Sequence, residues 1–262
     1  MAGLRGGRVA VSMEVTMCSR AAPDVDNEDA VAAGDTFAVA LDGATAEPGV
    51  ASGCRHGVRW FARSVAGELG RLLGADAAGP LPVLLSAAAG AVRTAHVDTC
   101  DLDDPRSPSA TVAMLRLRDD RVEHLVLGDA VLLLRDRRGA VTVVTDDRLR
   151  RFHHLPWSQL HGRRNVPGGF WVVGARPDAA AEALTGSVAV AELDCAAVLT
   201  DGAARLVERF GWTWGDLLAV LGRGGPAAVI AATRAAERAD PPVDPDDKTH
   251  DDASAAFCRF HV

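Results

Sequence analysis

A run of short apolar segments between residues 110 and 144 restricts the possible fold more than any other feature of the sequence. Asp, Gly or Arg residues typical of turns separate one segment from the next. Apolar and β-branched residues between such turns are typical of β-strands. The run therefore predicts a meander of antiparallel strands at Thr111 to Leu117, Arg121 to Leu127, Ala130 to Arg135 and Ala140 to Val144.

Two segments before this run have the periodicity of amphipathic helices. From Arg55 to Leu73, apolar residues recur three and four positions apart, which places them on one helical face, and Gly74 follows as a stop signal. From Pro82 to His96 the same pattern returns, and the proline suits a first helical turn. Both helices are predicted to pack on a sheet.

The remaining segments complete an α+β pattern. No internal repeat or low-complexity linker divides the chain, so residues 1–262 are predicted to form a single domain. Strands that alternate with paired helices indicate a sandwich. Strands are predicted at Ala30 to Ala33, Asp35 to Leu41, Gly169 to Val173, Ala196 to Thr200 and Ala253 to Phe260. Helices are predicted at Pro177 to Leu184, Ala203 to Phe210, Thr213 to Leu221 and Pro226 to Arg238, and a surface loop at Thr145 to Gly168.

Charge and cysteine content exclude several classes of protein. The net charge is -7 and no Lys/Arg-rich block occurs, which argues against nucleic acid or an anionic membrane as a partner. No stretch approaches the roughly 18 to 20 apolar residues of a membrane span, and we expect a cytoplasmic protein. The five cysteines are far apart in sequence and are interpreted as structural thiols, without a disulfide framework or a zinc finger. No feature indicates an oligomeric state.

Acidic residues accompany several of the predicted strands. Strand ends at one edge of a sheet lie close together, and ionised carboxylates that converge there repel one another unless cations bridge them. Oxygen ligands of this kind favour Mg²⁺ or Mn²⁺. Asp-Gly is also a common turn dipeptide, so each acid taken alone can simply end a strand. The candidates are Glu28, Asp29, Asp42 with Gly43, Asp129, Asp201 and Asp251.

The order of these acidic motifs resembles that of a known family. The segments NEDA (27–30), FAVALDGAT (37–45), SATVAMLRLRDDRVEHLVLGDAVLLL (109–134), VLTDGAARL (198–206) and HDDASAAFC (250–258) resemble the metal-dependent PPM, or type 2C, protein phosphatases in a short bacterial form. The resemblance runs from about residue 14 to residue 260. It implies a four-layer α/β/β/α sandwich of two antiparallel sheets flanked by helices, with a centre of two Mg²⁺ or Mn²⁺ ions at one end.

The resemblance also implies a role for each acid. Asp42 would bridge the two ions, the carbonyl of Gly43 would complete one coordination sphere, and Asp201 and Asp251 would hold one ion together. Glu28 and Asp29 would act at the same centre, and Asp129 would share a weaker third ion with Asp201. Catalysis would depend on Asp42 and Asp201.

The reaction implied is the hydrolysis of phosphoserine and phosphothreonine in phosphoproteins. A hydroxide bridging two divalent ions has a lowered pKa and can attack a phosphorus atom whose oxygens the same ions neutralise. No covalent phosphoenzyme is needed, which agrees with the interpretation of the cysteines as structural.

Two positions depart from the family pattern. Asp24 stands where many members have a phosphate-binding arginine, so Arg20, Arg163 or Arg164 would have to bind the phosphate instead. Ala44 stands where some members have a histidine that protonates the leaving group. Water or His161 would then supply the proton.

Because of these departures, two alternatives to an active phosphoprotein phosphatase stay open. One is a catalytically weak or inactive pseudophosphatase that binds a partner through Asp24 and the loop at 145–168. The other is a hydrolase of small phosphate esters. A zinc site at His153, His154 and His161 is not favoured, because no carboxylate or cysteine stands at matching spacing.

Overall fold

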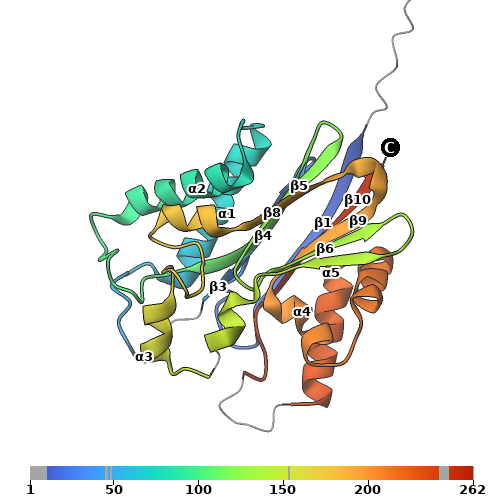
Figure 1. Ribbon diagram of the computed structural model, residues 1–262. Helices are drawn as coiled ribbons and strands as arrows, with labels where there is room; N and C mark the ends of the chain where they lie inside the picture. The colour runs from blue at the N-terminus through green and yellow to red at the C-terminus, as the bar shows by residue number, and fades with distance from the viewer. Residues whose placement is uncertain (1–10, 45–46, 48, 153, 242–247, 262) are drawn as a thin grey trace, which may run out of the picture.

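The structure, a computed structural model of the 262-residue chain, describes residues 11–44, 47, 49–152, 154–241 and 248–261. Two five-stranded sheets face each other and helices cover both outer faces (Figure 1), which confirms the predicted α/β/β/α sandwich. Every pair of neighbouring strands is antiparallel. The first sheet has the order β1 (Ser12–Arg20), β10 (Ala253–His261), β9 (Leu193–Leu199), β6 (Val131–Asp136), β7 (Val141–Val144), and the second β2 (Ala30–Gly34), β3 (Phe37–Gly43), β4 (Ala110–Arg118), β5 (Arg121–Leu127), β8 (Leu184–Ala189).

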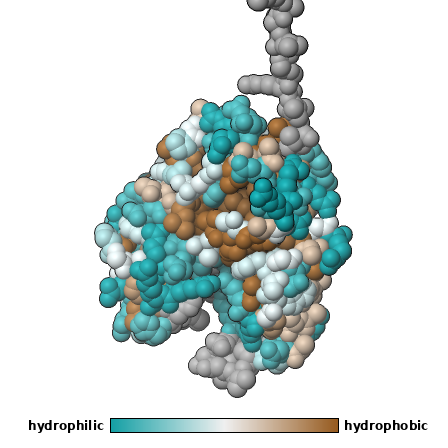
Figure 2. Space-filling view, turned by 45° about the vertical axis from the view of Figure 1, so that its right-hand side comes forward, coloured by the Kyte–Doolittle hydropathy of each residue, from teal (hydrophilic) through white to brown (hydrophobic). Residues whose placement is uncertain are grey.

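Each sheet has its own pair of covering helices. Helices α1 (Gly57–Gly74) and α2 (Leu81–His96) pack on the sheet that contains β3 and β4, and their bounds agree with the predicted helices. Helices α4 (Asp201–Glu208) and α5 (Trp214–Ala239) pack on the other sheet. Figure 2 shows hydrophobic residues in the middle of one face of the molecule with hydrophilic residues on both sides.

Strand β4 shows how the layers are held together. Val112 and Met114 face the helices α1 and α2, whereas Ala113 and Leu115 face the opposite sheet. All four are fully buried. Because successive side chains of a strand point to opposite faces, a continuously apolar strand fits the centre of a four-layer protein, with one core on each side of it.

The predicted meander is wrong in one respect, because its four strands do not belong to one sheet. β4 and β5 pair in one sheet, and β6 and β7 pair in the other. The chain crosses between the sheets at Gly128 and Asp129, where Gly128 has a φ of 80°. A Cβ atom there would lie 2.6 Å from Cγ2 of Thr111, so the crossover requires glycine. The crossover places Asp129 at the end of the sandwich, between the two sheets.

Two strands were not predicted from the sequence. β1 and β8 are edge strands whose residues are mostly exposed or half-buried, so they lack the apolar pattern of a buried strand. The predicted helix at 177–184 is a short 3₁₀ helix (Pro177–Glu182) that leads into β8, and the predicted strand at 169–173 forms only isolated bridges.

Helix α5 contains a break where two separate helices were predicted. Gly225, at a φ of 71°, interrupts the helical conformation directly before Pro226. By length and composition α5 could cross a membrane, but Leu217, Leu221 and Val229 pack against the sheet below it. Such packing is typical of a core helix.

Candidate metal centre

Four of the predicted acids line one cavity at the end of the sandwich where α3 (Trp157–Leu160) and α4 lie (Figure 1). Asp42 is the last residue but one of β3, and Asp129 follows β5. Asp201 is the first residue of α4, and Asp251 precedes β10 by two positions. Gly43 lines the same cavity. Residues separated by more than 200 positions in the sequence thus share one site.

Asp29 lies at the inner side of this group. It is 2% exposed, and its Oδ2 accepts a hydrogen bond of 2.8 Å from the hydroxyl of Thr200, the residue before Asp201. Its own backbone N–H donates to the side chain of Asn27 at 3.0 Å. The residue that holds the Asp29 carboxylate thus follows β9 of one sheet, whereas Asp29 itself directly precedes β2 of the other sheet.

Glu28 borders a neighbouring pocket that it shares with Lys248 and Asp251. Its backbone N–H donates to Oδ2 of Asp252 at 2.6 Å, and the other oxygen of Asp252 accepts from the N–H of Ala22 at 2.8 Å. The two adjacent acids at 251 and 252 thus differ in function: Asp252 holds the chain before β2 in place, and Asp251 faces the cavity.

Gly43 allows the end of β3 to approach the segment before β2. A Cβ atom at this position would lie 2.5 Å from the carbonyl oxygen of Glu28 and 2.5 Å from Cγ1 of Val58. Only glycine fits this approach. Coordination of a metal through the Gly43 carbonyl stays a prediction.

Burial and mutual repulsion raise the pKa of four of these carboxyl groups. Burial, followed by the charge of Asp201, raises the pKa of Asp42 well above its ordinary value. Burial also raises the pKa of Asp29 to about 8 and that of Asp129 to about 7, and the charge of Asp201 adds to both effects. The pKa of Asp251 is raised by burial and by Asp201, although Lys248 opposes this effect.

These crowded oxygens fit the chemistry of divalent cations. The side chains offer carboxylate oxygens without sulfur, which suits Mg²⁺ or Mn²⁺. In the part of the chain that the structure describes, the carboxylates do not bring three ligand atoms within 4.8 Å of one another. A bound cation would offset the mutual repulsion of these carboxylates.

Stability of the metal-free protein is expected to fall as the pH rises from about 4 to about 8. An aspartate titrates near 4 in the unfolded chain, whereas folding raises the pKa of Asp29 to about 8 and that of Asp129 to about 7. Between these values the folded state binds more protons, so each rise in pH favours unfolding. Urea unfolding in EDTA at several pH values measures this slope. In Asp29→Asn the slope should be shallower, and an equal slope would contradict the assignment.

Four basic side chains, Arg106, Lys248, Arg164 and His161, also line the cavity. Arg164 donates through Nη1 to the hydroxyl of Ser109 at 2.7 Å and through Nη2 to the carbonyl of Ser107 at 2.9 Å. Burial lowers its pKa to about 10. Asp104 holds the guanidinium of Arg106 through Nε and Nη2, at 2.9 and 2.7 Å. Sequence reasoning named Arg164 among three candidates but missed Arg106 and Lys248, which belong to no recognisable motif.

The other candidate arginines lie elsewhere. Arg20 is exposed at the end of β1 and does not line the cavity, and Asp24 is exposed at a φ of 63°. Arg163 is exposed and lies over the ring of Phe152, with its Cζ 5.9 Å from the ring centroid.

His161 is the loop histidine that reaches the cavity. Its Nε2 lies 3.7 Å from a carboxylate oxygen of Glu47. Burial and the charge of Arg164 lower its pKa, so the imidazole is mostly neutral near neutral pH. Of the other two histidines considered for a zinc site, His154 is exposed and His153 lies outside the described residues.

Comparison with known proteins agrees with the fold. No curated protein sequence matches the chain. Many solved structures share its fold, and three of them, all at low sequence identity, serve as examples. The catalytic domain of the serine/threonine phosphatase PstP, in complex with two manganese ions, has 16% identity and a TM-score of 0.64, and the likeness covers 97% of this chain and 100% of that one. The serine/threonine phosphatase Stp1 from Staphylococcus aureus has 12% identity and a TM-score of 0.61, with 100% of both chains covered. PppA from Pseudomonas aeruginosa has 18% identity and a TM-score of 0.63, with 96% of this chain and 100% of that one covered.

A family model agrees with these structural likenesses. The model for protein phosphatase 2C matches residues 19–222, which include five of the candidate acids, Glu28, Asp29, Asp42, Asp129 and Asp201. The match thus covers most of the chain, and the shared fold covers nearly all of it. This chain belongs to the protein phosphatase 2C family and is a hydrolase of the serine/threonine phosphatase type.

Proposed function

We propose that the carboxylates around this cavity hold two divalent ions, Mg²⁺ or Mn²⁺, and that the protein hydrolyses phosphoserine and phosphothreonine in proteins. The observation that carries the proposal is the convergence of Asp42, Asp129, Asp201 and Asp251 on one cavity. Burial together with the charge of Asp201 raises the pKa of the other three. The two manganese ions of the PstP structure belong to a protein of the same fold and support it.

The proposed ligand set follows the positions of the acids. Asp42 would contact both ions and the carbonyl of Gly43 one of them, as the family resemblance implies, and both residues line the cavity. Asp201 and Asp251 approach from the other sheet. Glu28 and Asp29 would complete the ligand set of the same two ions. Asp129 and Asp201 would together bind a weaker third ion.

The side chains of the cavity would bind and orient the phosphate ester. When bound, the two ions supply a water of lowered pKa and neutralise the phosphate oxygens. Arg106 is the arginine that we propose for phosphate recognition, since Asp104 fixes its guanidinium at the cavity wall while Arg20 lies elsewhere. His161 is mostly neutral, so water rather than this histidine would protonate the leaving group.

A second candidate is the hydrolysis of small phosphate esters. It is favoured by the position of Arg20, which is exposed at the end of β1 and absent from the cavity wall. Without an arginine from that segment, a large phosphoprotein would have fewer contacts beside the metal centre. The reaction at the phosphorus would be the same.

Removal of divalent ions is expected to abolish turnover. Full-length protein treated with EDTA should lose at least about 100-fold in the rate of phosphopeptide hydrolysis, because the carboxylates alone repel the substrate phosphate. Added Mn²⁺ or Mg²⁺ should restore the rate. Phosphate release from a phosphothreonine peptide and from p-nitrophenyl phosphate measures both activities.

The two substrates separate the alternatives. Cleavage of p-nitrophenyl phosphate with refusal of several phosphopeptides would favour the small-ester hydrolase. If neither substrate is cleaved at saturating Mn²⁺, although Mn²⁺ binding is detected by calorimetry, the proposed activity is wrong and the pseudophosphatase alternative stands.

A further inference from the structure

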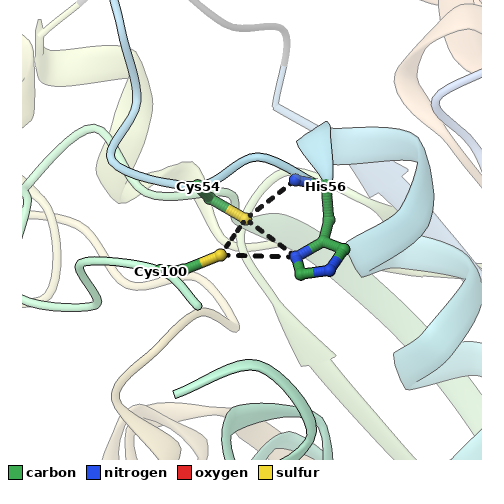
Figure 3. Close-up of side chains that lie close together, drawn as sticks. All are labelled: Cys54, His56 and Cys100. Carbon is green, nitrogen blue, oxygen red and sulfur yellow. Dashed lines mark hydrogen bonds between the residues drawn. The ribbon is translucent and has the colours of Figure 1, made fainter. Parts of the chain in front are cut away.

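Two cysteines and a histidine from two parts of the sequence lie close together (Figure 3). Cys54 and His56 lie just before α1, and Cys100 lies in the loop between α2 and β4. In Figure 3 the two sulfur atoms and one ring nitrogen of the imidazole point toward one another. Their ligand atoms lie within 4.8 Å of one another, which no other three His, Cys, Asp or Glu residues of the described chain achieve.

The distances fit three corners of a metal tetrahedron. The sulfur atoms of Cys54 and Cys100 are 3.4 Å apart, and Nδ1 of His56 lies 3.7 Å from the first and 3.3 Å from the second. Zn–S bonds of about 2.3 Å and a Zn–N bond of about 2.0 Å require separations of about 3.8 Å between sulfurs and about 3.5 Å between sulfur and nitrogen. Shifts of a few tenths of an ångström would complete the geometry.

The same distances do not describe a disulfide. Two bonded sulfur atoms are about 2.05 Å apart, well below the 3.4 Å between Cys54 and Cys100. The imidazole also contacts both sulfurs at similar distances, which a disulfide does not require. The arrangement of all three side chains is therefore that of a ligand set.

The neighbours of these side chains orient them before any ion binds. The ring of His56 stacks on Trp60 with centroids 4.4 Å apart, and the buried ring of His96 lies edge-on to both. The backbone N–H of His56 donates to the sulfur of Cys54 at 3.4 Å. Backbone donors of this kind stabilise thiolates.

The two loops are also joined directly next to the cysteines. The N–H of Asp101 donates to the carbonyl of Gly53 at 2.9 Å. Gly53 has a φ of 69°, and a Cβ atom there would lie 2.8 Å from the carbonyl oxygen of Asp101. Residues 53 and 101 are thus held in close contact, which brings the sulfurs of the adjacent cysteines together.

The protonation states are compatible with metal binding at two of the three positions. Burial, followed by the charges of Arg55 and His96, lowers the pKa of His56, which keeps the imidazole in its neutral, ligating form. Burial opposes ionisation of Cys100, but hydrogen bonds from the backbone of Arg55 and from Cys54 lower the pKa of its thiol. The pKa of Cys54 is raised by burial, so an ion would have to displace its proton.

We propose that Sγ of Cys54, Sγ of Cys100 and Nδ1 of His56 bind one thiophilic divalent cation, of which Zn²⁺ is the best match. Each thiol gives up its proton to water as it binds, and a water molecule takes the fourth coordination position. The set contains soft sulfur donors, so it selects a different class of ion from the carboxylate centre.

The position of this cation site connects it to the walls of the carboxylate cavity. The loop that contains Cys54 follows Asp42 and Gly43, and the loop that contains Cys100 leads to Ser107 and Ser109 on the cavity wall. A cation held by both loops would tie together two walls of the carboxylate cavity. This inference is independent of the proposed hydrolysis, because it concerns different ligands and a different ion.

Cobalt substitution tests the site without relying on activity. Reduced, metal-free full-length protein is titrated with Co²⁺ in the presence of saturating Mg²⁺, which occupies the carboxylates. The expected result is a thiolate-to-cobalt charge-transfer band that saturates at about one equivalent and is displaced by Zn²⁺. Zn²⁺ should also raise Tm by about 5 °C or more, because it binds the folded state alone.

Three variants and one control define the ligands. Cys54→Ser and Cys100→Ser should each lose most of the band, and His56→Asn should bind Co²⁺ at least about 10-fold more weakly. Cys18→Ser, at a half-buried thiol on β1, should behave as wild type. Circular dichroism establishes that each variant is folded.

Two outcomes would overturn the proposal. One is a folded, reduced wild type that shows no charge-transfer band, or a band that survives in both serine variants. The other is a Cys54–Cys100 disulfide, found by mass spectrometry in the protein as isolated, whose reduced form takes up neither Co²⁺ nor Zn²⁺.

Discussion

Replacing Asp42 with asparagine is expected to lower kcat/KM of metal-dependent phosphate-ester hydrolysis by at least about 100-fold, which corresponds to a loss of roughly 3 kcal/mol of transition-state stabilisation. Asp42 ends β3 beside the cavity, and its Oδ2 lies 3.4 Å from the backbone nitrogen of Asp201. Asparagine keeps the size of the side chain but removes the charge that the two proposed cations would share. Steady-state kinetics across a range of Mn²⁺ concentrations measure the loss.

Asp35→Asn is the matched control for this substitution. Asp35 is exposed in the turn before β3, at the opposite end of the same strand. Its replacement removes an equal charge and should leave kcat/KM within about twofold, since surface substitutions cost little. If both variants retain full Mn²⁺-dependent activity, the carboxylate centre is not the catalytic site.

Replacing Glu237 with glutamine is expected to destabilise the protein by about 3 to 5 kcal/mol. Glu237 on α5 is 1% exposed. Its Oε1 accepts a hydrogen bond of 2.8 Å from Arg205, and its Oε2 accepts one of 2.8 Å from Arg234 and lies 2.7 Å from Nδ1 of His250. Without the carboxylate, two largely buried guanidinium groups lose their counter-charge. Urea unfolding and Tm measure the effect.

The same substitution is expected to weaken metal binding. Arg205 also donates to the carbonyl of Lys248, and Arg234 donates to the carbonyl of Asp251. The ion network around Glu237 therefore holds the segment that brings Asp251 to the cavity. We expect Mn²⁺ affinity to fall by about 10-fold or more, as for other groups that position ligands. Calorimetry at a temperature where the variant is folded separates this effect from unfolding.

Glu68→Gln is the control for Glu237. Glu68 on α1 is half-buried and pairs with Arg71 on the same helix, so its loss should cost under about 1 kcal/mol. Equal stabilities for the two variants would contradict the assigned importance of the buried network.

The contribution of Glu237 to the free energy of unfolding should also depend on pH. Burial raises its pKa, but hydrogen bonds from His250 and Arg234 lower it below the ordinary value overall. Because the folded-state pKa is the lower one, the stabilisation is complete above about 4.5 and is lost as the pH falls through the folded-state pKa. The stability difference between wild type and Glu237→Gln should therefore shrink in strong acid.

The sequence alone predicted the elements whose signals are local. Helices α1 and α2 have one apolar face each, and their predicted bounds agree with the structure within about two residues. The Asp-Gly pairs at 42 and 201 mark the ends of buried strands, as expected of turn residues. The order of the acidic motifs was sufficient to indicate the family, which the match over residues 19–222 confirms.

Edge strands and sheet membership could not be predicted in this way. β1 and β8 each pair along one side only and are largely exposed, so no alternating apolar pattern marks them. The change of sheet at Gly128 depends on the space beside Thr111, a residue 17 positions earlier. Such information is absent from any short window of sequence.

The carboxylate centre and the Cys54, His56 and Cys100 cluster also show what the sequence determines and what only the tertiary structure decides. The sequence determined the type of each acid and its place at a strand end. The sequence also indicated the protein phosphatase 2C family. Only the tertiary structure decided that Arg106 and Arg164, rather than Arg20, line the cavity, and that Cys54, His56 and Cys100 meet. The physical reason is that turn chemistry and apolar periodicity act over a few residues, whereas the meeting of distant side chains depends on how buried surfaces pack together.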